Sequence, residues 1–122
     1  MTKQKRFTVK SELYSHTLFV ACGGSIYEAQ DAWIRKYPYI ERMNKEDLER
    51  MSNRVGCFCG TSTNVHMIYF YQKKPGCGVT VHETFHAVYH ILKSAGVRLS
   101  DESEEAFTYL LEDLVKKIVC KL

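Results

Sequence analysis

The sequence VHETFHAVYH, at residues 81–90, organises the rest of the chain. It contains the pattern H-E-x-x-H, with His82, Glu83 and His86 at the defined positions. On an α-helix, residues four apart lie on the same face, so the two histidines can present imidazole nitrogens to one metal ion. Glu83 lies beside them, where its carboxylate can accept a proton from an attacking water molecule. The pattern therefore predicts a helix that binds zinc and carries its own base.

An ordinary amphipathic helix is the alternative explanation of these residues. In that case Thr80 and Glu83 form a capping box at the helix N-terminus, and both histidines are simply exposed. The apolar residues favour a helix under either explanation, because they recur at helical spacing and predict a stripe that faces the core. This stripe consists of Val81, Phe85, Val88 and Leu92. His82 and His86 lie to one side of it, so one face can pack while its neighbour presents ligands.

A catalytic zinc site needs a third protein ligand besides the two histidines. His90 follows on the same helix, but it is eight residues from His82, or about 12 Å along the axis. We therefore expect His90 at the rim of the site, with its ring in solvent. A second helix is predicted over residues 100–111, and a short turn around Gly96 would fold it back against the first. The acidic first turn of this helix would then approach the histidines.

Two glutamates in this second helix compete for the third ligand position. The apolar stripe of the helix comprises Phe107, Leu110, Leu111, Leu114 and Ile118. Glu104 flanks that stripe and Glu105 points away from it, so periodicity alone favours Glu104. Glu105, however, shares a face with Tyr109 one turn later, and a tyrosine at the edge of a metal cleft can donate to a reacting oxygen. Both glutamates would also complement the dipole of any helix at its first turn.

The residues HETFHAVYHILKSAGVRLSDESEEAFTYLL resemble the core of small HExxH proteins of the gluzincin type, particularly compact ones encoded by phages and prophages. In those proteins H-E-x-F-H-A is followed in the next helix by E-A-[FY]-x-Y-L. The resemblance covers about residues 78 to 115, and a more distant one connects the chain to metallopeptidases that cleave phage-type repressors. It implies that His82, His86 and Glu105 bind zinc. It also implies that Glu83 is the catalytic carboxylate.

Length and composition indicate one soluble domain. We expect a single domain over residues 1–122, with residues 1–12 as a flexible N-terminal arm. The 17 basic and 14 acidic residues leave a net charge of only +3, so nucleic-acid binding is not expected; only the basic cluster near the N-terminus favours it. Without a membrane-spanning run or a signal peptide, we expect a cytoplasmic protein with no membrane partner. The five cysteines, an odd number, then favour reduced thiols.

The residues upstream of the motif predict a small sheet with additional helices. Strands are predicted at residues 17–22, 55–61 and 65–71, and helices at residues 26–37 and 44–51. His66 lies in the last of these strands and could approach the metal, although strand histidines are more often structural. We expect this strand to be an exposed sheet edge to which an extended peptide adds, with the first strand as the next candidate.

Together these features predict an α+β domain. A small, mostly antiparallel sheet precedes two antiparallel C-terminal helices that hold one Zn²⁺ between them, the minimal zincin layout. Its metal ligands would be His82, His86 and Glu105, while Glu83 and Tyr109 would act in catalysis. The expected activity is hydrolysis of a peptide bond in a specific protein or peptide substrate. The alternative is a regulatory or protein-interaction module that keeps zinc for structure and cleaves nothing.

Overall fold

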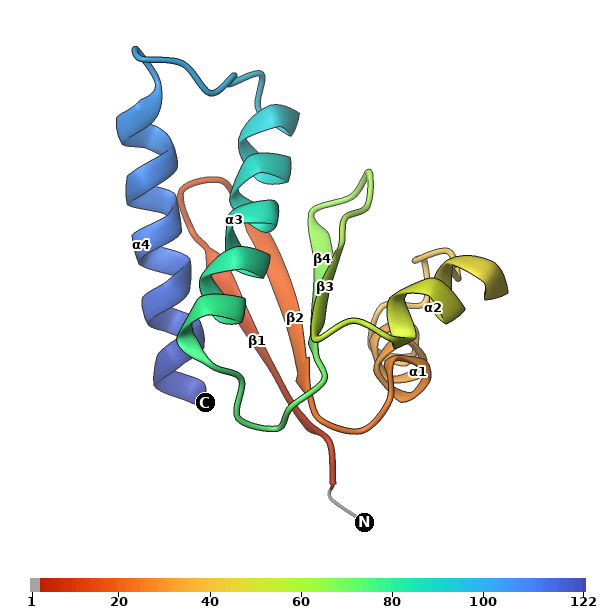
Figure 1. Ribbon diagram of the computed structural model, residues 1–122. Coiled ribbons are helices and arrows are strands. Elements are labelled where there is room, and N and C mark those ends of the chain that lie inside the picture. Colours follow the sequence, from red (N-terminus) through yellow and green to blue (C-terminus); the bar gives the residue numbers. More distant parts are fainter. Residues whose placement is uncertain (1–2) are drawn as a thin grey trace.

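The protein is built from a four-stranded sheet with helices on both faces. The computed structural model describes residues 3–122. The elements follow one another in the order β1 (Lys5–Ser11), β2 (His16–Cys22), α1 (Ile26–Lys36), α2 (Lys45–Ser52), β3 (Gly56–Cys59), β4 (Val65–Phe70), α3 (Cys77–Ser94) and α4 (Glu104–Lys121). Figure 1 shows α3 and α4 running in opposite directions on one side of the sheet, with α1 and α2 on the other. The fold class is therefore α+β, as predicted.

The sheet is mixed, with the strand order β1-β2-β4-β3. The β1–β2 and β3–β4 pairs are antiparallel, while β2 and β4 are parallel. A parallel pair needs a long crossover connection, which here includes α1 and α2. Strand β4 therefore has a partner on each side. The prediction that this strand is an exposed edge is wrong, and β2, the second candidate, is also interior; the edges are β1 and β3.

Strand β1 corrects the prediction of a flexible arm over residues 1–12. It pairs with β2 along its whole length. Lys117 and Lys121 of α4 donate hydrogen bonds to two of its carbonyl oxygens, at 2.7 and 3.0 Å. The alternation of Phe7 and Val9 with polar residues is a strand signal, but the charged neighbours obscured it. Residues 1 and 2 of the expected arm lie outside the described residues.

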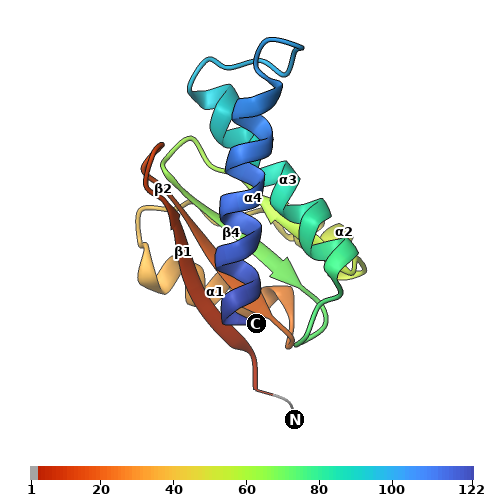
Figure 2. The ribbon, with the colours of Figure 1, turned by 90° about the vertical axis from the view of Figure 1, so that its left-hand side faces the viewer.

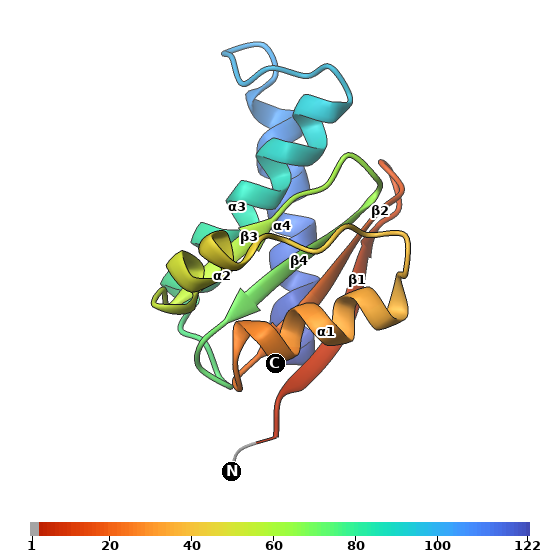
Figure 3. The ribbon, with the colours of Figure 1, turned by 90° about the vertical axis from the view of Figure 1, so that its right-hand side faces the viewer.

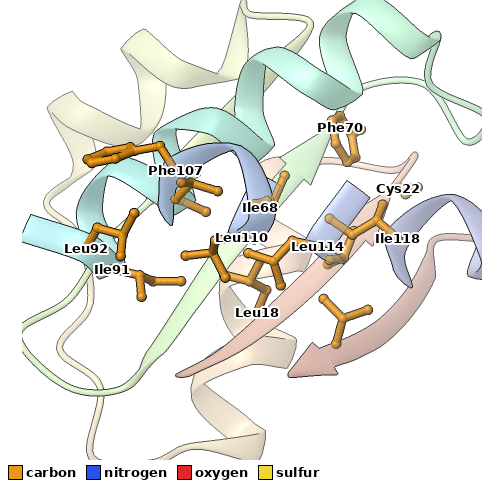
Figure 4. Packing of buried hydrophobic residues seen from close by; sticks show 14 residues of the cluster. Leu18, Cys22, Ile68, Phe70, Ile91, Leu92, Phe107, Leu110, Leu114 and Ile118 are labelled. Carbon is orange, nitrogen blue, oxygen red and sulfur yellow. The ribbon is translucent and has the colours of Figure 1, made fainter. Parts of the chain in front are cut away.

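Two apolar clusters fill the spaces between the sheet and its helices. Alternate side chains of a strand point to opposite faces, so β2, β3 and β4 contribute to both clusters, while β1 contributes only to the one beneath α3 and α4. Helices α3 and α4 cover one face (Figure 2), and α1 and α2 cover the other (Figure 3). Figure 4 shows Leu18 and Ile68 of the sheet packed beneath α4. The predicted α4 stripe is confirmed: Phe107, Leu110, Leu114 and Ile118 are buried, and Leu111 is partly buried.

Helix α3 begins about one turn before the capping-box alternative requires. Its N-cap is Gly76, and the Thr80 hydroxyl donates to the Gly76 carbonyl oxygen at 2.8 Å. Thr80 and Glu83 therefore lie inside the helix, and the capping-box interpretation is wrong. The predicted turn around Gly96 is confirmed, because the helix ends at Ser94 and Gly96 has a φ of 80°.

The buried stripe of α3 is rotated from the predicted one. Val88 and Leu92 are fully buried, but Val81 and Phe85 are 41% and 36% exposed. The residues that α3 buries are Thr80, Glu83, Thr84, Ala87, Val88, Ile91 and Leu92. Two threonines and a glutamate contribute little to an apolar pattern, so hydropathy misplaced the centre of the stripe. Because the buried face is rotated in this way, Glu83 lies beneath the helix, between α3 and the sheet.

Candidate active site

His82 and His86 lie one turn apart on the exposed face of α3. Their Nε2 atoms are 3.3 Å apart, and the two ring planes are inclined by 74°. Two imidazole nitrogens bound tetrahedrally to zinc, with bonds of about 2.1 Å, would be separated by about 3.4 Å. The distance between the two nitrogens therefore matches that of two ligand positions around a single zinc ion.

Glu83 extends from the same helical turn toward the sheet. It is only 6% exposed, and its Oε2 atom lies 3.9 Å from His82 Nε2. The Glu83 side chain packs over Gly56 of β3. A Cβ atom at Gly56 would lie 3.1 Å from Glu83 Cγ and 3.3 Å from the Tyr69 carbonyl oxygen. A glycine at this position thus leaves room for Glu83 between α3 and β3.

The surroundings of Glu83 suit a general base. Burial raises the pKa of its carboxyl group, because removal from water disfavours the charged form. Positive charge on His82, on His86 and on Arg54 opposes that shift. A carboxylate of ordinary pKa holds a proton weakly, so the raised pKa of Glu83 makes it better able to carry a proton between two steps of a reaction.

A cleft of about 600 Å³ opens beside these residues. Helix α3 forms one wall, and β3 with the end of α2 forms the other. The lining residues are Met51, Arg54, Val55, Gly56, Cys57, Phe58, Gly78, Val79, His82, Glu83 and His86. The volume is within the range of small-molecule and peptide sites, about 300 to 1,000 Å³. The H-E-x-x-H residues and a space for a substrate therefore occur together.

The structure does not bring a third ligand to the histidine pair. Among residues 3–122, no three histidine, cysteine, aspartate or glutamate side chains form a group able to hold a metal. Glu104 and Glu105 are exposed in the first turn of α4, which begins near the C-terminal end of α3 (Figure 1). Glu104 lies three residues before Phe107 on α4. The ring of Phe107 is 6.5 Å from that of Phe85 on α3. Glu105 shares the face of Tyr109 instead. The identity of the third ligand stays a prediction.

Tyr109 does not line the cleft that holds His82 and Glu83. Its side chain is exposed and lines a separate groove of about 430 Å³. This groove lies between α4 and the loop that joins β1 to β2. The structure thus places Tyr109 in a different groove from the H-E-x-x-H residues, and its contact with a reacting oxygen stays a prediction.

The other three histidines form a separate cluster. His66 is fully buried, and its Nδ1 accepts a hydrogen bond from the Thr61 N–H at 3.0 Å. The hydrogen on this ring is therefore assigned to Nε2, which donates to His16 Nδ1 at 2.8 Å. His90 Nε2 donates to the Thr61 carbonyl oxygen at 2.8 Å, and its ring centre is 4.6 Å from that of His66. His90 is thus half-buried and bonded, in place of the solvated ring predicted, and His66 belongs to this cluster.

Two glycines that the sequence interpretation overlooked position α3 on β3. Gly56 accommodates Glu83, and a Cβ atom at Gly60 would lie only 2.7 Å from the Cε1 atom of His90. Arg54, in the wall of the cleft, was overlooked as well. Glycine within or beside a strand often marks the close approach of another group, so Gly56 and Gly60 carried a usable signal. Arg54 carried none, because it resembles any charged residue before a strand.

No protein-family model, curated protein or solved structure matches this chain. Within residues 3–122, no helix is both long enough and apolar enough to cross a membrane. All five cysteines are free thiols. The case for an activity therefore rests on the geometry of α3 and of the cleft beside it.

Proposed function

We propose that the protein is a zinc-dependent hydrolase that cleaves a peptide bond. One observation carries this proposal: the Nε2 atoms of His82 and His86 are 3.3 Å apart at the cleft, with the buried carboxyl group of Glu83 beside them. Metal-assisted hydrolysis requires metal ligands, a base and a space for substrate in this relation. Structural zinc sites are closed by four protein ligands, whereas two histidines at a cleft leave coordination positions open. That difference favours an enzyme over a module that keeps zinc for structure.

Individual residues have separate roles in the proposed hydrolysis. His82 and His86 hold the metal through Nε2, and the resemblance to gluzincins makes Glu105 the proposed third ligand. When bound, Zn²⁺ supplies a Lewis acid that polarises the scissile carbonyl group. Glu83 takes a proton from the attacking water and passes it to the leaving amine. Contact with Gly56 restricts the Glu83 side chain, which favours one orientation of its carboxylate.

We infer that the substrate lies as an extended segment beside β3. This strand is an edge of the sheet, and its residues Gly56, Cys57 and Phe58 line the cleft. An edge strand offers unpaired backbone N–H and C=O groups to an extended peptide. The other edge, β1, is occupied by lysine side chains of α4. β3 therefore replaces β4 as the candidate strand for substrate pairing.

The test is cleavage by the zinc-loaded protein and its Glu83→Gln variant. A mixture of denatured proteins is incubated with each, and the products are identified by mass spectrometry. The parent should cleave, and Glu83→Gln should bind zinc but lose about 10²- to 10⁴-fold in rate, because it lacks the base. Glu112→Gln is the matched control, since Glu112 is exposed on α4 and pairs with Lys116 away from the cleft.

Two outcomes would reject this function. Cleavage by Glu83→Gln at the parental rate would show that Glu83 is not the base. Zinc uptake by the parent without any cleavage would favour the protein-interaction module instead.

A further inference from the structure

Arg54 is a cation in the cleft without a protein partner. It lies between α2 and β3, and among residues 3–122 it is the only lysine or arginine that lines the cleft. Within residues 3–122, its guanidinium group makes no hydrogen bond or ion pair. Arg50, one turn earlier, is different, because its guanidinium pairs with Asp47 on the same helix. The charge of Arg54 is thus available to a group that enters the cleft.

The charge of Arg54 acts on the reactive part of the cleft. Arg54 lies close enough to Glu83 for its positive charge to oppose the effect of burial, although the pKa of that carboxyl group is still raised. In the described part of the chain, Glu83 is the only acidic residue of the cleft wall. The cleft lining also includes the apolar residues Met51, Val55, Phe58 and Val79, and Arg54 itself is exposed. A negative group of a substrate that enters the cleft would therefore meet one accessible cation.

We propose that Arg54 selects substrates by binding a carboxylate of the peptide, from either an acidic side chain or a free C-terminus. This inference rests on the proposed hydrolysis. A guanidinium group presents its N–H donors in a planar fork that matches the two oxygens of a carboxylate. Arg54 acts on binding, so its loss should raise KM more than it lowers kcat.

Cleavage profiling tests this selection. The zinc-loaded protein is incubated with peptides from a digested proteome, with and without amidated C-termini, and the products are sequenced. We expect aspartate or glutamate at a fixed position relative to the cleaved bond, or cleavage at a fixed distance from the C-terminus that amidation abolishes. Arg54→Met should lose this preference, with a fall of about ten- to a hundredfold in kcat/KM for the acidic peptides. Arg54→Glu should instead favour lysine or arginine there, while the control Arg50→Met should cleave like the parent.

Binding provides a readout that is independent of turnover. The most frequently cleaved peptide is synthesised with its carboxylate and as the matching amide, and both are titrated into zinc-loaded Glu83→Gln. The carboxylate form should bind about ten- to a hundredfold more tightly, and Arg54→Met in the same background should remove that difference.

The failures of the two proposals are distinguishable. Cleavage without a carboxylate preference, or a preference that persists in Arg54→Met, would overturn the role of Arg54 while leaving hydrolysis in place. If the zinc-loaded parent cleaves no peptide, the proposed function fails, and the inference about Arg54 fails with it.

Discussion

Acid should destabilise this fold through His66, well above the pH at which most carboxylates titrate. Protonation of His66 Nδ1 would place two donors face to face, because that atom accepts the Thr61 N–H. Burial, and then the neighbouring His90 and His16, lower the pKa of His66 to about 3. The aromatic ring of Phe58 is a further neighbour and offers no counter-charge. The folded protein therefore resists a proton that the unfolded chain accepts.

The size of the effect follows from the two pKa values. An unfolded histidine has a pKa of about 6.5, so above that pH His66 is neutral in both states and adds no pH dependence. As the pH falls below 6.5, only the unfolded state binds the proton, and the free energy of unfolding declines until about pH 3. At about 1.4 kcal/mol per pH unit, the loss from His66 is about 2 kcal/mol at pH 5. Domains have a total stability of about 5 to 15 kcal/mol, so this loss is measurable.

Urea denaturation followed by circular dichroism measures the effect at pH 7.5, 6 and 5. The comparison is His66→Gln, because a glutamine amide can accept from the Thr61 N–H and donate to His16. Other titrating groups are common to both proteins, so the difference between their pH slopes reports mainly on the His66 cluster. The parent should lose about 2 kcal/mol more than the variant between pH 7.5 and 5. Parallel slopes would refute the reasoning, even if the variant is less stable at every pH.

Five substitutions test other parts of the account. Gly60→Ala should lower the free energy of unfolding, measured by urea denaturation, by about 1 to 3 kcal/mol, because the added Cβ would lie 2.7 Å from Cε1 of His90. Ile91→Ala should cost about 2 to 5 kcal/mol and Val81→Ala less than about 1 kcal/mol, since Ile91 is fully buried and Val81 is 41% exposed; equal costs would contradict the rotated stripe. Glu105→Ala should weaken zinc binding in calorimetry more than Glu104→Ala, as the resemblance implies, and the reverse order would favour the face of α4 that contacts α3.

Helices were the most predictable part of the fold because their signals are local. Ser25 and Asn44 are residue types typical of N-caps, and their side chains accept hydrogen bonds from backbone N–H groups three residues later, at 3.1 and 2.8 Å. The order of the sheet was not readable. The interior position of β4 depends on its parallel pairing with β2, which the packing of intervening helices determines and no nearby residue reveals.

In the candidate site, too, local features could be predicted from the sequence, and contacts between distant elements could not. The approach of His82 to His86 follows from helical spacing alone, so the sequence could predict it. The position of Glu83 over Gly56 depends on how α3 crosses β3. The availability of Arg54 depends on whether the fold places an acidic partner beside it. The separation of Tyr109 from the cleft likewise reflects the rotation of α4 about its axis. Such relations arise between elements that are distant in the sequence.

Zinc titration tests the central claim most directly. The chain is purified without chelators, its metal content is measured, and Zn²⁺ is titrated into the metal-free protein by calorimetry. The account predicts about one zinc per chain, since His82 and His86 supply the histidine ligands of a single site, and loss of that binding in His82→Ala. His16→Gln, outside the cleft, should bind as the parent does. Absence of zinc uptake by the parent, or equal uptake by His82→Ala, would contradict the account.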